Sequence, residues 1–465
     1  MNVSFLDRVV SSDIMSKSID KSIEKGMLYG YTDLLSNICN PIGRMTIRQA
    51  FIDGRYIFQP CEIKYIDKNT GNYLIYSQAI SRDMKDVREI NVSPAMDRIL
   101  FNAINLTLFE NFGHLIHKSS KAYQKGIGIG NIVTELSADL KYNASKGSLL
   151  AVKGDFKKFF DTVPIDLINQ WLDILFPNDC PVGKAVKVFY NDNRVIVNGK
   201  LVERYTSLTQ GCALATTLCN LILRDVDKEI YEMSNGKYIR YSDDFLIYSD
   251  NALECYEVMC KRLNELKLQI NPKKTEYIKS GDWFTFLGFK INEEQITFSK
   301  KTIKTFQKEI RKRTVDLIGQ KQADGTRLLK MNRNQLNKAI KNINSYLYTS
   351  FDKNSNNFGW GQYFLGTVTV EEDIKTLDTY IKDCLRACYT GRTKIGYLGS
   401  SDKVERSPGR HVKTNYERTH TDDWDLIKDL GTYRSMIHMW KTKRTNAELF
   451  NAEVRQMRNG MKICV

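Results

Sequence analysis

Acidic side chains stand at two places where short apolar runs end. Asp155 closes the run SLLAVKGD, and Asp243 and Asp244 lie in the tight turn between YIRY and FLIYS. Adjacent carboxylates repel each other, and a tight turn needs only one Asn, Asp or Gly, so the pair costs stability unless a cation neutralises it. Hard carboxylate oxygens suit Mg²⁺, which takes one or two protein carboxylates per ion and completes its shell with water and substrate phosphates. The three residues therefore predict a site for two Mg²⁺ ions, with Mn²⁺ as the alternative, that performs in-line displacement at phosphorus.

The stretch that contains these residues alternates strand and helix patterns. SLLAVKGDF predicts a buried strand, IDLINQWLDIL a helix that begins after Pro164, and VIVNGKLV a hairpin turned at Asn198 and Gly199. Residues 215–233 predict one long helix, and YIRYSDDFLIYS predicts two strands joined by the acidic turn. This order favours an antiparallel sheet backed by two helices, close to the ferredoxin-like split βαβ arrangement. Such a sheet places loops from different strands side by side.

Helical patterns flank this sheet on both sides. Apolar residues recur at helical spacing from Pro94 to Phe112, and a second helix is predicted from Ile132 to about Tyr142. Residues 300–341 hold 13 Lys and Arg against 3 Asp and Glu, a net charge of +10 on helical segments. Such an excess favours a track for nucleic acid phosphates, with a solvated helix face as the alternative. The loop FGWGQYF follows, and its aromatic rings are expected to pack in their own core, with base stacking as the alternative.

Length and composition limit the fold classes and cellular locations that the chain can have. The 465 residues exceed the roughly 250–300 residues of a single core, so two or more lobes are expected. With 42% hydrophobic residues, disorder is excluded for most of the chain. The ten cysteines show no metal-site spacing, and the net charge of +15 favours a polyanionic partner. No apolar run approaches the ~18–20 residues of a membrane span and the first residues lack a signal-peptide core, so we expect a cytoplasmic protein with no membrane partner.

Five segments in order resemble the palm motifs of reverse transcriptases, as found in group II introns and their bacterial relatives: DFKKFFDTV (Asp155–Val163), TQGCALATTLCN (Thr209–Asn220), YSDD (Tyr241–Asp244), NPKKT (Asn271–Thr275) and FLGF (Phe286–Phe289). The resemblance spans roughly residues 88–386. It implies an α+β right-hand polymerase with fingers, a ferredoxin-like palm, a helical thumb and a small C-terminal helical extension. The expected domains are residues 1–147 (N-terminal region and fingers), 148–290 (palm, with part of the fingers inserted), 291–390 (basic thumb) and 391–465 (extension).

The resemblance also implies roles for single residues. Asp155, Asp243 and Asp244 would be the catalytic, metal-binding carboxylates. The expected nucleotide-binding residues are Arg88, Arg98, Lys125, Phe160, Gln210, Gly211 and Lys274. Those expected to position the primer are Phe286, Leu287, Gly288 and Phe289.

Within these sets, Phe160 would exclude a 2′-hydroxyl and Lys274 would give a proton to pyrophosphate. If the chain stays extended past Asp155, only one of Phe159 and Phe160 can face the site, and we expect Phe160. Asp161 is expected to cap the helix that follows Pro164.

The function implied is an RNA-directed DNA polymerase that uses an RNA template and dNTPs and yields DNA. The second motif departs from the family, because Ala213, Ala215 and Thr216 replace Pro, Ser and Pro, and this puts template handling in question. By elimination the chain is similar to the solitary bacterial enzymes of abortive infection and antiphage defence, some of which copy a dedicated noncoding RNA. One alternative is template-independent, protein-primed synthesis, and another is a catalytically idle RNA-binding protein. Whether copies of the chain associate as a homo-oligomer stays open.

Overall fold

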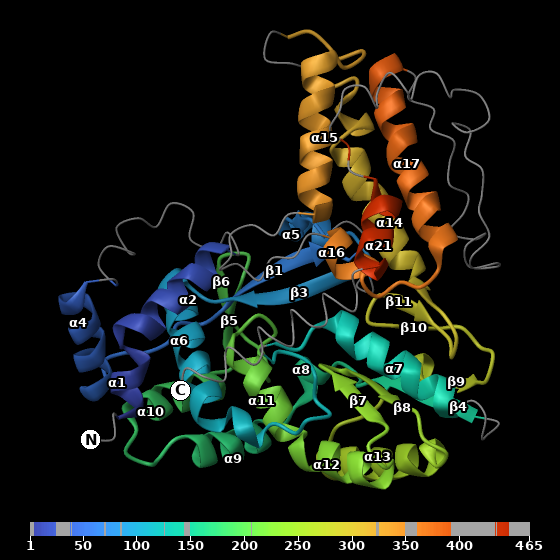
Figure 1. Ribbon diagram of the computed structural model, residues 1–465. Coiled ribbons are helices and arrows are strands. Elements are labelled where there is room, and N and C mark those ends of the chain that lie inside the picture. Colours follow the sequence, from blue (N-terminus) through green and yellow to red (C-terminus); the bar gives the residue numbers. More distant parts are fainter. Residues whose placement is uncertain are drawn as a thin grey trace. The chain divides into compact units, whose positions relative to one another are not determined.

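Two compact units make up the computed structural model of this protein (Figure 1). Residues 1–125 and 149–278 form unit 1, and residues 126–148 and 279–465 form unit 2. The structure describes residues 4–24, 38, 40–68, 71–83, 86–124, 126–143, 149–205, 207–321, 325–348, 360–391, 433 and 435–445. Lys125 lies outside the described residues. Within the described part of the chain, no helix is both long and apolar enough to traverse a bilayer.

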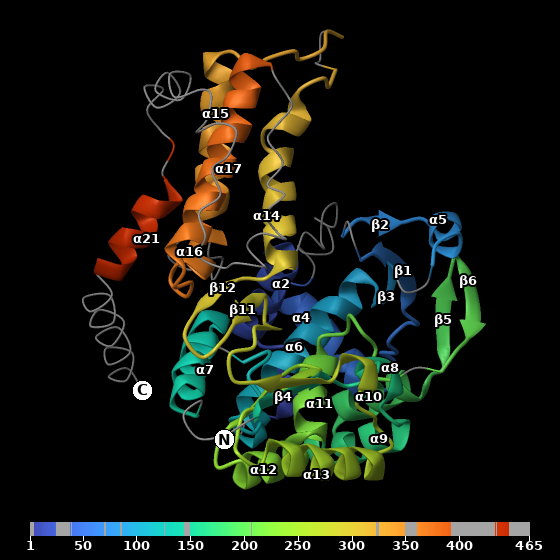
Figure 2. The ribbon, with the colours of Figure 1, turned by 90° about the vertical axis from the view of Figure 1, so that its right-hand side faces the viewer.

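Unit 1 contains a four-stranded sheet in the order β7-β8-β4-β9. Its strands are β4 (Leu149–Asp155), β7 (Tyr238–Tyr241), β8 (Asp244–Ile247) and β9 (Glu276–Lys279). Strand β8 pairs antiparallel with both β4 and β7. Helices α12 (Arg224–Met233) and α13 (Ala252–Glu265) lie together along one face, as both views show (Figures 1 and 2). This strand order with two covering helices is the predicted ferredoxin-like arrangement, which is therefore confirmed.

A second sheet of unit 1 is built on β1 (Glu62–Asp67). It pairs antiparallel with β2 (Tyr73–Leu74) and β3 (Val87–Val92), and parallel with β5 (Arg194–Val197), which pairs with β6 (Lys200–Glu203). The predicted turn at Asn198 and Gly199 is confirmed, since both have positive φ, 49° and 77°, as a two-residue hairpin of this kind requires.

The sequence order placed this hairpin with the strands of the acidic sheet, and that assignment is wrong. The Ile196 amide donates instead to the Cys61 carbonyl, at 2.9 Å. Local turn chemistry specifies a hairpin but not the sheet edge against which it pairs.

Helices fill the rest of unit 1. They are α1 (Phe5–Val9), α2 (Ser12–Glu24), α4 (Pro41–Ile52), α5 (Tyr76–Ile80), α6 (Ala95–Phe112), α8 (Phe159–Thr162), α9 (Ile165–Leu175), α10 (Pro181–Asn191) and α11 (Leu214–Ile222). Helix α6 confirms the helix predicted up to Phe112, and Ile99, Leu100 and Ile104 on it are fully buried.

The single helix predicted over residues 215–233 is wrong. Residue Leu223, with φ −92° and ψ 2°, separates α11 from α12. No Gly or Pro marks this break, so composition could not reveal it.

Unit 2 combines helices with a three-stranded sheet. The strands are β10 (Phe284–Phe286), β11 (Phe289–Ile291) and β12 (Ile296–Phe298), and the helices are α7 (Ile129–Asn143), α14 (Lys300–Lys312), α15 (Arg333–Tyr348), α16 (Trp360–Leu365), α17 (Glu371–Thr390) and α21 (Met436–Thr445). Trp360 stacks on Phe298 with ring centroids 5.4 Å apart and lies 4.4 Å from Phe306. Phe364 lies 5.0 Å from Phe289 and 4.8 Å from Trp360, so the described aromatic residues of the segment FGWGQYF pack in their own core, as expected; Phe358 lies outside the described residues.

The part of the C-terminal region that is described packs on α17. The Tyr433 hydroxyl and the Met436 amide both donate to the Asp378 carboxylate, at 2.6 and 2.7 Å. The Trp440 indole N–H donates to the Val368 carbonyl at 2.9 Å. Asp378 is only 2% exposed, so this buried carboxylate anchors helix α21 to α17.

Candidate functional site

The three predicted acidic residues lie at one edge of the four-stranded sheet. Asp155 and Asp244 are directly opposite each other in the β4–β8 register. Asp243 lies in the turn between β7 and β8, and its carbonyl accepts a hydrogen bond from the Phe156 amide at 2.9 Å. We call residues 241–244 the acidic turn. The expectation that the sheet brings residue 155 and this turn together is confirmed.

Gly154 allows this close pairing. A Cβ at residue 154 would lie 2.7 Å from the Phe245 ring, which is closer than side-chain carbons pack. Glycine therefore lets β4 and β8 approach while the Phe245 ring fills the space beside them. Any side chain at this position would move Asp155 away from the acidic turn.

Burial and like charge make the carboxylates an unusual group. The Asp155 side chain is 8% exposed; its Oδ2 accepts a hydrogen bond from Lys274 Nζ at 2.6 Å, and its buried Oδ1 has no partner. Such an orphaned oxygen costs free energy unless a cation or donor meets it. Desolvation, followed by the charges of Asp243 and Asp155, raises the pKa of Asp244 to about 6 although its side chain still meets solvent. The hydrogen bond to Asp155 raises the pKa of Lys274, so that residue keeps its proton.

These residues fit a hard divalent cation. They offer only oxygen donors, they repel one another without positive charge, and one buried oxygen is left over for a ligand. Among the residues that the structure describes, no three Asp, Glu, His or Cys side chains converge as a ready-made metal cluster. Mg²⁺ needs only one or two protein carboxylates per ion, with water and phosphate oxygens as the other ligands, so the spaced carboxylates suit it.

The segment after Asp155 does not stay extended. The backbone turns at Lys158, where φ is 48°, and enters the short helix α8. Phe159 is 2% exposed and packs on Phe156 with ring centroids 5.7 Å apart, whereas Phe160 is only half-buried. Of the two rings, Phe160 is therefore the one with accessible surface. The prediction gave side-chain alternation along a strand as the reason, but the segment is helical here.

The assignment of Asp161 as a helix cap is wrong. Asp161 lies inside α8, in its first turn, and Pro164 occupies the N-cap position of α9. The prediction assumed a strand followed directly by one helix. The intervening short helix takes Asp161 away from the cap position.

Gln210 and Gly211 lie against β3. The Gln210 carbonyl accepts a hydrogen bond from the Asn91 amide at 2.8 Å. Gly211 has φ 115°, and a Cβ there would lie 2.3 Å from the Asn91 carbonyl oxygen. Only glycine permits this close approach of two backbones. The Leu208 amide ties the same loop to the Phe160 carbonyl at 3.1 Å, so the loop and Phe160 are held together.

The remaining predicted residues are spread more widely. Arg88 is exposed on β3, and Arg98 is half-buried near the start of α6. Phe286–Phe289 belong to unit 2, where they form the β10–β11 hairpin with Leu287 and Gly288 at positive φ, 51° and 86°. The Gly288 carbonyl accepts hydrogen bonds from the Ser299 amide at 3.1 Å and the Thr302 hydroxyl at 2.6 Å, which fixes the hairpin turn.

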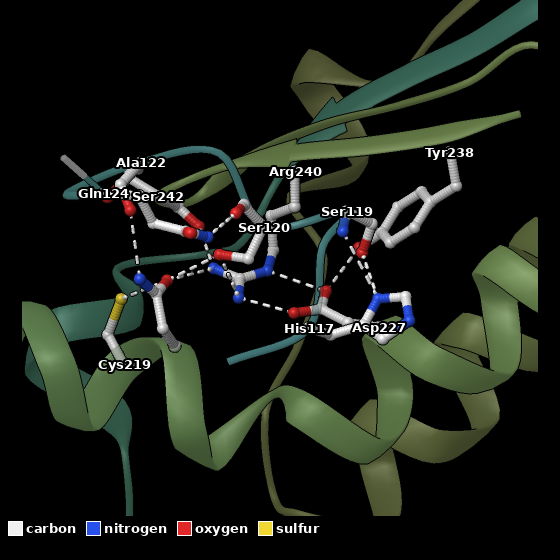
Figure 3. Close-up of polar contacts among 11 residues, drawn as sticks. His117, Ser119, Ser120, Ala122, Gln124, Cys219, Asp227, Tyr238, Arg240 and Ser242 are labelled. Carbon is white, nitrogen blue, oxygen red and sulfur yellow. Dashed lines mark hydrogen bonds and ion pairs between the residues drawn. The ribbon is translucent and has the colours of Figure 1, made fainter. Parts of the chain in front are cut away.

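The sequence patterns missed a buried polar cluster next to the acidic turn (Figure 3). Its centre is Arg240 of β7, which is 0% exposed and forms an ion pair with Asp227 of α12 at 2.6 Å. One signal was available in the sequence, because an arginine inside the apolar run YIRY has to be paired if the strand is buried.

Comparisons with known proteins agree with the motif order. Residues 67–291 match the family model described as reverse transcriptase (RNA-dependent DNA polymerase). The Gag-Pro-Pol polyprotein of simian retrovirus SRV-2 is 33% identical over 101 residues, which are 21% of this chain and 6% of that polyprotein. The chain thus spans a small part of this curated relative.

Two solved structures show how distant the structural similarity is. Apo telomerase from Candida tropicalis is 13% identical, with a TM-score of 0.41 over 71% of this chain and 58% of its own. Sicinivirus 3Dpol RNA-dependent RNA polymerase is 12% identical, with a TM-score of 0.36 over 56% of this chain and 57% of its own. Residues 67–291, just under half of the chain, thus match the reverse transcriptase family model, and the ordered motifs and the placement of their acidic residues at one edge of a sheet agree with that match.

Proposed function

We propose that this protein is an RNA-directed DNA polymerase that joins dNTPs to a primer by two-metal nucleotidyl transfer. The observation that carries the proposal is the register of β4 and β8, which sets Asp155 opposite Asp244 with an unpartnered buried carboxylate oxygen between strand end and turn. The match of residues 67–291 to the reverse transcriptase family model supports the same reaction.

Asp155, Asp243 and Asp244 are the residues that would hold Mg²⁺. When bound, the ions activate the primer 3′-hydroxyl and stabilise the charge of the leaving pyrophosphate. Lys274 lies next to Asp155 and keeps its proton, because its pKa is raised. It is therefore suited to give that proton to the departing pyrophosphate oxygen.

The nucleotide pocket in this proposal is formed by Phe160 and the loop at Gln210 and Gly211. The Phe160 ring would lie under the sugar and exclude a 2′-hydroxyl. Gly211 lets the loop backbone come close to β3, which fixes the loop beside Asn91. Arg88, Arg98 and Lys125 are the proposed triphosphate contacts, and the hairpin Phe286–Phe289 is the proposed primer support.

Replacing Asp243 and Asp244 by Ala tests the reaction. The double variant should incorporate no dNTP above background on an RNA template with a DNA primer, because both ions would lose a carboxylate ligand. Asp250→Ala is the control, since it removes an exposed carboxylate just beyond β8 and should keep full activity. Circular dichroism and thermal unfolding should show that both variants fold. Substantial dNTP incorporation by the folded double variant would refute the proposal.

We further propose that the template is a dedicated noncoding RNA and that the biological role is antiphage defence. The support is that the motif sequences of this chain resemble those of the solitary bacterial enzymes. Sequencing the nucleic acid that co-purifies with the protein tests this. One recurrent noncoding RNA together with its DNA copy is the expected result, and random cellular RNA without complementary DNA would contradict it.

A further inference from the structure

Arg240 is the most polar side chain among the largest fully buried ones in the described part of the chain. All five of its N–H groups meet an acceptor (Figure 3). Its Nε donates to Asp227 Oδ1 at 2.8 Å, and its Nη2 donates to Asp227 Oδ2 at 2.6 Å and to the Ser120 hydroxyl at 3.0 Å. Its Nη1 donates to the Ser242 carbonyl at 2.9 Å and to Asn220 Oδ1 at 3.2 Å.

These acceptors come from four separate segments of unit 1. Asn220 is on α11, Asp227 is on α12, Ser242 is in the acidic turn, and Ser120 follows the α6 region in the chain. One planar group thus joins α11, α12 and the acidic turn to Ser120, which is 120 residues away in the chain. A lysine could not replace it, because an ammonium lacks the rigid fork of five donors.

The main chain at Arg240 reinforces the same junction. Its amide donates to the Ser119 carbonyl at 2.9 Å, and its carbonyl accepts from the Lys121 amide at 2.8 Å. The Tyr123 hydroxyl lies 3.0 Å from the Ser242 hydroxyl, and Asn220 Nδ2 donates to the Ala122 carbonyl at 3.0 Å. The segment of residues 119–124 is therefore tied to the acidic turn from both sides.

Stability alone does not account for this arrangement. A buried ion pair is commonly no more stabilising than apolar side chains of the same volume, because both charges lose their hydration. What the pair adds is direction, since each hydrogen bond holds its partner in one orientation. Among the side-chain hydrogen bonds of Arg240, the one from Nη1 to the Ser242 carbonyl reaches the acidic turn. It holds the residue immediately before Asp243.

We propose that Arg240, anchored by Asp227, is a positioning residue that sets the acidic turn for metal binding and joins it to residues 119–124. The proposal rests on the proposed function, in which Asp243 and Asp244 hold Mg²⁺. Without the guanidinium, the Ser242 carbonyl loses its donor, and the turn is held in its orientation by fewer hydrogen bonds. The two carboxylates then meet the cation less often in the binding geometry.

Mn²⁺ binding to the purified protein tests this without any need for turnover. Free Mn²⁺ is counted by electron paramagnetic resonance as the ion is added to wild type, Arg240→Lys and the matched control Arg262→Lys. Arg262 forms a partly exposed ion pair with Glu229 between α12 and α13, at 2.7 Å, and neither residue belongs to the acidic turn. Arg240→Lys should raise the Mn²⁺ half-saturation by about tenfold or more, as loss of groups that orient metal ligands commonly does, and the control should stay within about twofold of wild type.

A second readout separates positioning from general loss of structure. In the incorporation assay, Arg240→Lys should raise the Mg²⁺ concentration for half-maximal rate, whereas partial unfolding would lower the maximal rate and leave that concentration unchanged. A folded Arg240→Lys protein with wild-type half-saturation for both ions would overturn the proposal.

Ser120→Ala provides the test if Arg240→Lys does not fold. It deletes one acceptor of Nη2 and one donor to Asn220, and it leaves the ion pair in place. The half-saturation should rise by roughly two- to fivefold, because one of several orienting bonds is lost. An unchanged value in folded Ser120→Ala would overturn the proposal. Failure of the proposed function would look different, since Asp243→Ala with Asp244→Ala would then leave Mn²⁺ binding to the protein unaltered.

Discussion

At the residue scale, the site depends on side chains whose surroundings differ sharply although they are neighbours in the chain or in the sheet. Phe159 is buried against Phe156, whereas Phe160 beside it keeps accessible surface. The same contrast holds for Asp155, which is buried and paired with Lys274, and Asp244, which still meets solvent. Residues of the same type therefore have different roles in the proposed site, according to their burial and contacts.

Phe160→Ala should relax sugar selection. Without the ring, a ribose 2′-hydroxyl has room, so the ratio of rNTP to dNTP incorporation should rise by roughly tenfold or more, as the loss of a steric barrier allows. Primer extension with each nucleotide class measures this ratio. Phe159→Leu is the matched control, because it trims the buried neighbour and should lower thermal stability with the ratio unchanged. Equal ratios in Phe160→Ala and wild type would contradict the role given to Phe160.

At the element scale, close approaches between strands and loops hold the site together. Gly154 lets β4 pair tightly with β8, and Gly211 lets the loop before α11 lie on β3. These contacts are between parts of the chain that are distant in sequence. Each glycine therefore matters for packing between elements more than for its own turn.

Gly211→Ala should destabilise unit 1 and impair activity. Its added Cβ would meet the Asn91 carbonyl oxygen at 2.3 Å, which only a backbone shift can relieve. The matched control is Gly281→Ala, where φ is likewise positive, 87°, and nothing lies within 4 Å of the added carbon. We expect the control to cost only the left-handed backbone penalty of about 1–2 kcal/mol, and Gly211→Ala clearly more. Urea unfolding followed by circular dichroism compares them, and equal losses would refute the clash argument.

Helix α14 presents a basic face that should bind nucleic acid. Ile303, Phe306 and Ile310 are buried on one side, while Lys301 and Lys304 are exposed. Replacing both lysines by Gln should weaken binding of a template–primer duplex and lower the salt slope of the affinity by roughly 2, because about one counterion is released per phosphate contact. Fluorescence anisotropy across a salt series measures the slope. Lys184→Gln with Lys261→Gln, two exposed lysines of unit 1, should leave it unchanged. An unaltered slope in the α14 variant would show a merely solvated helix face.

At the scale of the whole molecule, charge is unevenly distributed. The chain carries +15, and residues 300–341 alone account for +10. The acidic turn is the opposite extreme, because burial and the neighbouring carboxylates raise the pKa of Asp244. Basic helices that would hold a polyanion and carboxylates that would hold a cation are together what the proposed function requires.

Incubation of the purified enzyme with one labelled dNTP at a time distinguishes templated from untemplated synthesis. We expect label only when an RNA template and primer are supplied, since the proposed reaction copies RNA. Covalently labelled protein in the absence of RNA would instead favour protein-primed, template-independent synthesis. Mg²⁺-dependent incorporation under either condition would exclude a catalytically idle RNA-binding protein.

Much of unit 1 could be predicted from sequence because its signals are local. The turn residues Asn198 and Gly199, the helix after Pro164 and the two strands around the acidic turn all follow from side-chain types over a few positions. The sequence patterns did not predict the break at Leu223, and they assigned the 194–203 hairpin to the wrong sheet. Both depend on packing partners that lie far away in the chain.

The sequence alone was enough to predict the proposed chemistry. Carboxylates at a strand end and in a tight turn, in the order of the reverse transcriptase motifs, favour metal-dependent nucleotidyl transfer because a bound cation would offset their repulsion. Only the tertiary structure decided what holds them in place. In the sequence, Arg240 is only a single charge in an apolar strand. In the structure, acceptors from four segments surround its buried guanidinium, and a local sequence pattern does not predict them.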